Sequence, residues 1–129
     1  MLAVDTNVIV RFLISDDSVQ AERARAIFEG EAVLLLKTVL LETEWVLRRL
    51  YRLNPRRIGE AFMAMIALPA VQCEDLNAVT KAIGWMRKGL DFAYALHLAS
   101  ASPAGRFATF DRTLAGRVVN VADIKVVRL

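Results

Sequence analysis

Leu2-Ala3-Val4-Asp5-Thr6-Asn7 is the stretch of sequence that decides the fold. Residues 2–4 form a short apolar run with β-branched character, which predicts a buried strand of a parallel sheet. The apolar run at residues 8–13 predicts that a helix begins directly after the polar residues. Because ligands bind at the carboxyl ends of the strands in an open parallel sheet, Asp5 lies where chemistry is expected. A helix N-cap is the alternative interpretation, since Asp, Thr and Asn all accept from free N–H groups.

Candidate strands and helices alternate along the rest of the chain, with no internal repeat, low-complexity tract or linker. The further candidate strands cover residues 33–36, 71–73, 107–109 and 118–121. The helical patterns cover residues 8–13, 18–29, 39–53, 55–67, 76–88, 92–101 and 112–115. Strands that alternate with helices predict parallel crossovers. We therefore expect an α/β fold, a three-layer α/β/α sandwich around a parallel four- to five-stranded sheet.

The composition predicts one folded domain over residues 1–129. The chain is 56% apolar with a mean hydropathy of +0.39, which suits a single core and excludes disorder. No apolar run approaches the roughly 18 residues of a membrane span, and the N-terminus has no secretion signal, so no membrane association is expected. The single cysteine, Cys73, excludes an internal disulfide and a cysteine-built zinc site. It fits a reducing compartment, and we expect a cytoplasmic protein.

Basic residues cluster in one short segment of a mildly basic chain. The net charge is +3 and the isoelectric point is near 9.4, which favours a polyanionic partner without proving one. Within ten residues that contain no acid lie five arginines: Arg48, Arg49, Arg52, Arg56 and Arg57. They form either a solvated helix face with its loop, or a contact surface for phosphates or for an acidic partner segment.

Two glutamates of the helical segment 39–53 are predicted to have different environments. At about 100° per residue the apolar stripe consists of Val39, Val46, Leu50 and Leu53. Glu42 lies about 60° from the centre of this stripe and is predicted to face the interior or a cleft edge. Glu44 lies about 140° away, where it can pair with Arg48 on the solvent side. An inward carboxylate needs a partner such as Arg49, or a metal ion.

Two further acids occupy positions similar to that of Asp5. Asp111 follows the candidate strand 107–109 through Phe110, so it also lies at the carboxyl edge of a strand. Asp91 follows Gly89 and Leu90 and begins the helical segment 92–101. An N-cap is again the alternative interpretation of each.

Four segments that contain these acids resemble the PIN-domain nucleases, specifically the VapC-like toxins of prokaryotic toxin–antitoxin pairs. The segments are Val4-Asp5-Thr6-Asn7-Val8-Ile9, Val39-Leu40-Leu41-Glu42-Thr43-Glu44-Trp45-Val46-Leu47, Leu90-Asp91-Phe92-Ala93-Tyr94-Ala95-Leu96-His97-Leu98-Ala99 and Ala108-Thr109-Phe110-Asp111-Arg112-Thr113-Leu114-Ala115. They occur in the family order and at the family spacing, and the resemblance covers nearly the whole chain. The family glutamate aligns with Glu42.

The resemblance implies an endoribonuclease that cleaves RNA phosphodiesters at a Mg²⁺ or Mn²⁺ centre. It also implies a cognate antitoxin and a homodimer. The implied catalytic residues and metal ligands are Asp5, Glu42, Asp91 and Asp111. The implied supporting residues are Thr6, Asn7, Thr109 and Tyr94. The residues expected to contact RNA or antitoxin are Arg48, Arg49 and Arg52.

Tyr94 departs from the family pattern. Relatives usually read Asp-Phe-Ala-Asp-Ala where this chain reads Asp91-Phe92-Ala93-Tyr94-Ala95, and a neutral phenol with a pKa near 10 is a poor ligand for Mg²⁺. Asp91 lies one turn earlier on the same helix face. It either partly replaces the missing ligand or leaves the centre incomplete, and the alternative function is therefore a degenerate PIN domain that binds RNA or antitoxin without cutting.

A phosphoryl-transfer domain is a third class that places an aspartate after the first strand. A haloacid-dehalogenase-like phosphatase would need an aspartate at position 7, where this chain has Asn7. A receiver domain would need a second acid beside the first-strand aspartate and a late lysine at a strand end. Neither pattern is evident in this chain.

Overall fold

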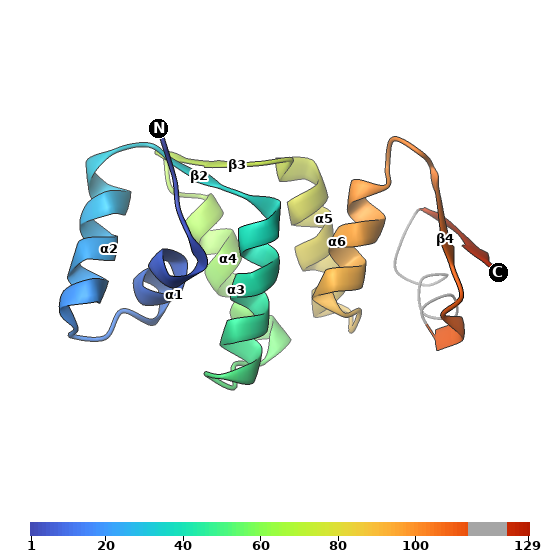
Figure 1. Cartoon of the computed structure of the whole chain (residues 1–129), viewed down its shortest axis with the longest axis horizontal. Coiled ribbons are helices and arrows are strands. Elements are labelled where there is room, and N and C mark those ends of the chain that lie inside the picture. Colours follow the sequence, from blue (N-terminus) through green and yellow to red (C-terminus); the bar gives the residue numbers. More distant parts are fainter. Residues whose placement is uncertain (114–123) are drawn as a thin grey trace. The chain divides into compact units, whose positions relative to one another are not determined.

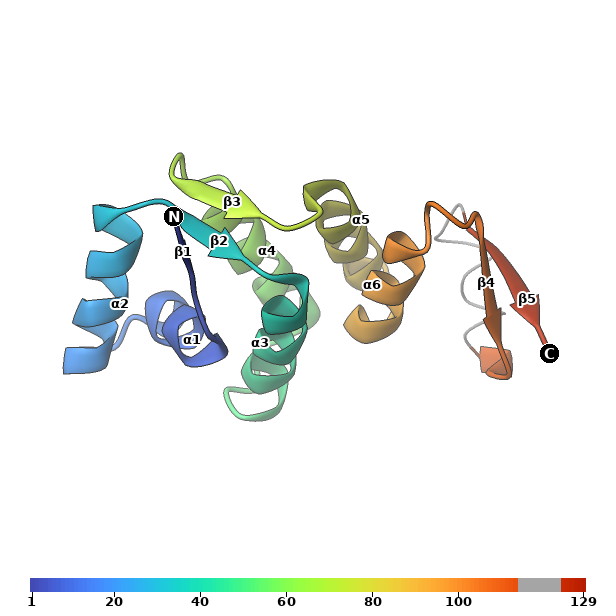
Figure 2. The ribbon, with the colours of Figure 1, turned by 45° about the horizontal axis from the view of Figure 1, so that its top comes forward.

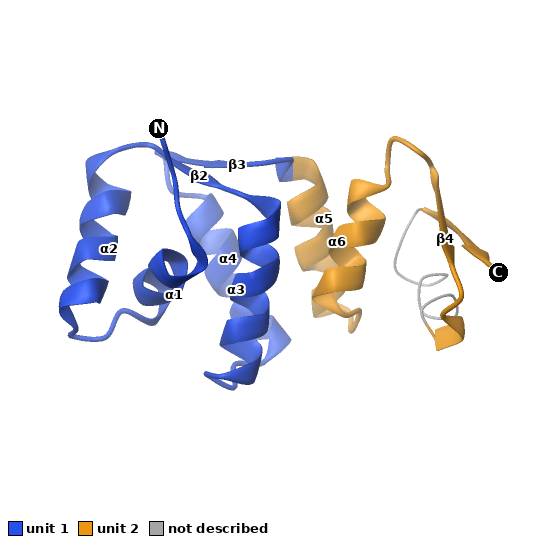
Figure 3. Cartoon of the chain, in the orientation of Figure 1, with its two compact units in different colours: residues 1–76 blue, residues 77–129 orange. Residues whose placement is uncertain are grey.

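The computed structural model describes residues 1–113 and 124–129 (Figure 1). Those residues form two compact units, Met1–Leu76 and Asn77–Leu129 (Figure 3). The expected strand at residues 118–121 lies outside the described residues, as does the second half of the expected helix at residues 112–115.

The first unit is a parallel sheet whose strands are joined by pairs of helices. Its elements are β1 (Leu2–Ala3), α1 (Thr6–Ile14), α2 (Val19–Gly30), β2 (Val33–Leu35), α3 (Lys37–Arg49), α4 (Pro55–Ile66) and β3 (Val71–Cys73). The strand order is β1-β2-β3, with Leu2 opposite Val33 and Val33 opposite Val71 (Figure 2). Each crossover thus carries two helices, and the expected strands in this part of the chain are confirmed to within one residue.

Side-chain caps fix where two of these helices begin. The Ser18 hydroxyl accepts from the Ala21 N–H at 3.1 Å at the start of α2. The Asn54 side chain accepts from the Arg57 N–H at 2.9 Å at the start of α4, where Pro55 occupies the first position. Proline is tolerated there because the N–H that it lacks would have no partner within the helix.

The apolar sides of the first unit's helices are closely packed. Ile9, Leu40 and Phe62 are completely buried, as are the sheet residues Val33 and Leu35. Between α1 and α2, the rings of Phe12 and Phe28 stack with their centroids 3.9 Å apart and their planes at 11°. Burial of this kind is the main stabilising term of a fold and holds α1 and α2 together.

The face that α3 buries differs from the one predicted. Its buried residues are Leu40, Thr43, Glu44 and Leu47. Glu44 is only 4% exposed, so its predicted solvent-side environment was wrong. Glu42 is exposed, which contradicts the predicted interior position but not the cleft edge. The reason is that α3 ends at Arg49: Leu50 is 67% exposed, and neither it nor Leu53 belongs to the helix whose stripe they were taken to define. The predicted pair is present, however, because Arg48 Nε lies 2.8 Å from Glu44 Oε2.

This pair supplies a stability prediction. Replacing Arg48→Met leaves the buried Glu44 carboxylate without its ion-pair partner, so we expect the free energy of unfolding to fall by about 1–2 kcal/mol. The matched control is Arg49→Met, since Arg49 is exposed and its loss is expected to change stability by less than about 0.5 kcal/mol. Urea denaturation followed by circular dichroism measures both. Equal effects of the two substitutions would contradict the prediction.

The second unit contains α5 (Leu76–Arg87), α6 (Phe92–Ser100), β4 (Arg106–Thr109) and β5 (Lys125–Arg128), the first residue of α5 belonging to the first unit. β4 and β5 pair in parallel, with Arg106 opposite Lys125, and β4 confirms the strand expected at residues 107–109. Gly89 and Gly105 follow the two helices with φ values of +106° and +71°. Glycine adopts this left-handed conformation without steric cost, which suits Gly89 to the end of α5; Gly105 lies five residues beyond α6, directly before β4.

The expected α/β fold with parallel strands is confirmed. The described residues contain six helices and five strands, with three strands in the sheet of the first unit and two in that of the second. Every pairing between them is parallel. None of the helices in residues 1–113 and 124–129 is both long and apolar enough to cross a membrane.

Cys73 lies in β3 and is half-buried. Burial, reinforced by the neighbouring carboxylates of Glu74 and Asp75, raises its pKa to about 11. The reactive thiolate is therefore scarcely populated at neutral pH.

Candidate active site

Asp5 caps α1 and retains one free carboxylate oxygen. The chain leaves β1 through the buried Val4, and Asp5 Oδ1 then accepts from the Thr6 N–H at 2.8 Å. The Asp5 carbonyl accepts from the N–H groups of Val8 and Ile9. The other side-chain oxygen has no hydrogen-bond partner among residues 1–113 and 124–129, and Asp5 is exposed. The cap and site interpretations of Asp5 are therefore compatible.

Thr6 connects the start of α1 to α3. Its side chain is 5% exposed, and its hydroxyl donates a hydrogen bond to Glu42 Oε1. Thr6 thus binds Asp5 through its backbone N–H and Glu42 through its hydroxyl. Both acids are therefore hydrogen-bonded to the same residue in the first turn of α1. The family pattern implied a supporting role for Thr6, and the helical pattern offered Arg49 as a partner of Glu42. The contact with Glu42 was missed, because nothing in the local pattern relates residues 36 positions apart.

The other predicted residues of the first unit lie apart from this contact. Asn7 is exposed and lines a pocket between α1 and α2. Arg48 pairs with Glu44, Arg49 is the exposed last residue of α3, and Arg52 lies in the loop after it with a φ of +56°.

In the second unit the predicted site residues gather around Tyr94. Asp91 caps α6, and its Oδ2 accepts from the Tyr94 N–H at 3.3 Å. The Tyr94 hydroxyl donates to Asp111 Oδ2, also at 3.3 Å. The Thr109 hydroxyl oxygen in turn accepts from the Asp111 N–H at 3.0 Å. Tyr94 therefore contacts both Asp91 and Asp111, an arrangement that the sequence pattern did not reveal.

The Asp111 carboxylate favours the protonated form of Tyr94. The nearby Asp111 carboxylate, its hydrogen bond with the phenol and the more distant Asp91 raise the pKa of Tyr94 above its ordinary value. A second negative charge next to a carboxylate is unfavourable, so Asp111 opposes ionisation of a phenol that is already protonated at neutral pH at its ordinary pKa near 10. In that form it donates a hydrogen bond and offers no anionic ligand.

The acids supply donor chemistry that fits a divalent cation. Asp5 and Glu42 belong to the first unit, and Asp91 and Asp111 to the second. In the part of the chain that the structure describes, no group of three or more histidine, cysteine or acidic side chains is placed to hold a metal ion. Mg²⁺ prefers carboxylate oxygens, is often bound by only one or two of them, and keeps several of its waters. The carboxylates of Asp5 and Glu42, and likewise those of Asp91 and Asp111, are therefore ligands of the type that Mg²⁺ prefers.

Tyr94 provides a pH prediction. We expect the ultraviolet phenolate titration of the native protein to contain a component whose pKa lies above the ordinary value near 10, and Tyr94→Phe should remove it. Asp111→Asn should move that component down, since it takes away the negative charge that opposes ionisation. The remaining tyrosine, Tyr51, is the internal control. A Tyr94 component at or below the ordinary pKa would refute the hydrogen bond with an ionised Asp111.

Comparison with known proteins identifies the family. The sequence model of the PIN domain matches residues 2–117, so the chain belongs to the PIN-domain family. This confirms the resemblance found in the sequence.

Among solved structures, the chain is similar to the Mycobacterium tuberculosis toxin VapC20, which is described as cleaving the Sarcin-Ricin loop. The two are 19% identical, the match covers 90% of this chain and 95% of the other, and the TM-score is 0.44. No curated protein sequence matches this chain.

Proposed function

We propose that this chain is a divalent-metal-dependent endoribonuclease and the toxin of a toxin–antitoxin pair. Membership of the PIN-domain family supports nuclease activity. The observation that carries the proposal is the arrangement at the start of α1, where Asp5 follows the first strand with one oxygen free and Thr6 holds Glu42. The carboxyl ends of parallel strands are where ligands bind in such folds.

In this proposal Asp5, Glu42, Asp91 and Asp111 hold Mg²⁺ or Mn²⁺. Held by these carboxylates, a divalent cation would supply an activated ligand water and compensation of the charge on the phosphate. The protein's own groups orient these acids: Thr6 holds Glu42, and the backbone contact with Thr109 fixes the turn at Asp111. Tyr94 keeps a neutral donor beside Asp111.

A specific observation supports the alternative function, a domain that binds RNA or antitoxin without cutting. The Tyr94 hydroxyl occupies one oxygen of Asp111, at the position where the family pattern has a further aspartate. A site with one carboxylate fewer binds a cation more weakly, because affinity depends on ligand charge and number. Low activity of the native protein is therefore part of the proposal.

Substitutions at Asp5 and at Tyr94 test the proposal. Asp5→Asn should reduce RNA cleavage by at least about 100-fold, since even residues behind the metal ligands contribute 10- to 100-fold. Tyr94→Asp should tighten Mn²⁺ binding and raise cleavage, because it restores a carboxylate. Isothermal titration with Mn²⁺ and cleavage of a labelled RNA measure these effects. Asp17→Asn, at an exposed acid of the α1–α2 loop, is the control and should change neither.

Three outcomes would decide against the proposal as stated. Undiminished cleavage in the presence of a chelator would exclude the metal centre. Mn²⁺ binding without cleavage, in both the native protein and Tyr94→Asp, would establish the alternative function. No change on Tyr94→Asp in either measurement would show that position 94 does not belong to the metal site.

The proposed partners are an RNA substrate, a cognate antitoxin and a second copy of the chain in a homodimer. Arg48, Arg49 and Arg52 are the proposed contacts for RNA or antitoxin, because they form an acid-free basic segment. Light scattering at micromolar concentration should give the mass of a dimer. A monomer at this concentration would contradict the proposed assembly.

A further inference from the structure

A pocket of about 250 Å³ opens between α1 and α2 of the first unit. Its apolar wall includes Val8 from α1 and Ile27 from α2. Its polar groups are Asn7, Arg11, Gln20 and Arg23. The pocket begins in the helix turn that Asp5 caps, since Asn7 lies two residues after Asp5. Asn7 therefore places one end of the pocket near the start of α1, where Asp5 lies.

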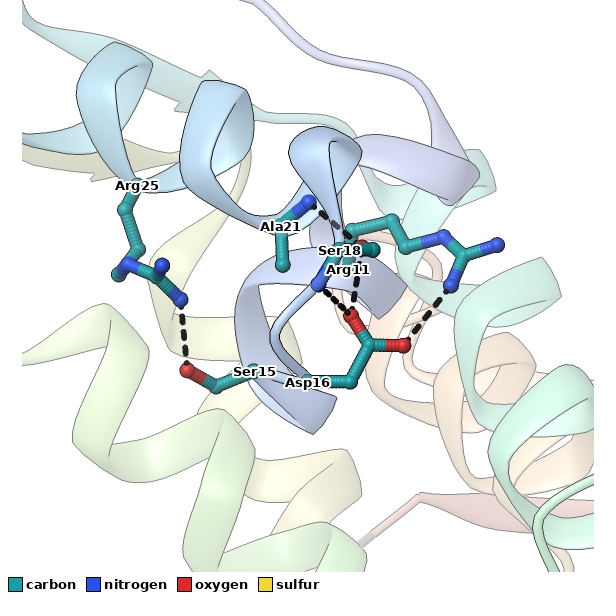
Figure 4. A network of polar contacts seen from close by, with 6 residues as sticks. All are labelled: Arg11, Ser15, Asp16, Ser18, Ala21 and Arg25. Carbon is teal, nitrogen blue, oxygen red and sulfur yellow. Dashed lines mark hydrogen bonds and ion pairs between the residues drawn. The ribbon is translucent and has the colours of Figure 1, made fainter.

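The two arginines of the pocket differ in their partners among the described residues. Arg11 Nη1 binds Asp16 Oδ2 at 3.1 Å, and Asp16 is itself held by the N–H and hydroxyl of Ser18 (Figure 4). Arg11 is thus fixed in position and partly neutralised. Arg23 is exposed and has no hydrogen bond or ion pair with any described residue. No acid lines the pocket, so an anionic ligand would find in Arg23 an uncompensated charge.

The neutral polar groups favour a nucleobase over other ligands. Asn7 and Gln20 each carry an amide with both donors and an acceptor, which is what the edge of a base requires. The aliphatic side chains of Val8 and Ile27 offer an apolar surface for the face of a ring. Unpaired bases of single-stranded RNA are recognised by such a combination of edge hydrogen bonds and contacts to the ring face, with arginine planes on the bases or phosphates.

We propose that this pocket is a nucleobase subsite that selects the base next to the cleaved phosphodiester. Gln20 and Asn7 read the edge of the base, and Arg23 binds an adjoining phosphate. The inference rests on the proposed ribonuclease function, to which it adds a determinant of sequence preference.

Binding measured without cleavage tests the subsite. Labelled homotetraribonucleotides of A, C, G and U are titrated with the full chain in a chelator, and the fluorescence anisotropy is recorded. We expect one base to bind at least about fivefold more tightly than the others, since a well-placed pair of hydrogen bonds discriminates by about that factor or more. Gln20→Ala should reduce this preference, whereas Arg23→Gln should weaken all four RNAs by a similar factor, as the loss of a phosphate contact does.

The matched control is Arg87→Gln, which removes the same charge from an exposed arginine at the end of α5, outside the basic segment. It should weaken binding less than Arg23→Gln. Both Gln20 and Arg23 are exposed, so their variants should keep the native thermal unfolding curve. Equal affinities for the four bases, or equal effects of Arg23→Gln and Arg87→Gln, would overturn the subsite.

The outcomes separate this inference from the proposed function. Base-selective, Arg23-dependent binding by a protein that never cleaves RNA supports the subsite and contradicts the ribonuclease. Cleavage whose sequence preference is unchanged by Gln20→Ala and Arg23→Gln supports the ribonuclease and overturns the subsite. If a peptide of alternating leucine and aspartate binds in an Arg23-dependent way while the oligonucleotides do not, the pocket is a peptide site and the nucleobase assignment is wrong.

Discussion

The hydrogen bonds at the start of α1 are the constraint on which the first unit's candidate site depends. A helix begins with N–H groups that have no partner in the helix, and Asp5 satisfies one of them at the point where β1 ends. The same turn places the buried Thr6 hydroxyl on Glu42 of α3 and directs Asn7 toward the pocket between α1 and α2. The proposed metal site and the proposed nucleobase subsite therefore share one structural origin.

In the second unit, a neutral tyrosine, Tyr94, lies where the family pattern has an aspartate. A carboxylate at this position would add negative charge beside Asp91 and Asp111 and would need a cation to relieve the repulsion. The phenol instead donates to Asp111 and stays neutral. Asp111 thereby accepts a hydrogen bond from the residue that departs from the family pattern.

The sequence predicted most strands and helices because apolar periodicity is a local signal. Its failure at α3 has a specific physical cause: Leu50 and Leu53 extended the apparent stripe beyond the end of the helix, so the predicted face was rotated away from the one that contains Leu40 and Leu47. The contacts of Thr6 with Glu42 and of Tyr94 with Asp111 were not predictable, since they join residues 36 and 17 positions apart. The identities of the candidate acids came from the family pattern, and the structure adds their partners.

The double role of Asp5 has an evolutionary consequence. Asparagine caps helices about as well as aspartate, and it presents the same side-chain oxygen to the Thr6 N–H. A single change at this position would remove the anionic charge that the proposed chemistry requires while α1 keeps its beginning. A change of Asp5 to asparagine would thus leave the stability of the fold nearly unchanged, so selection on stability alone cannot preserve the acid. Its persistence in a lineage would have to come from selection on what the protein does.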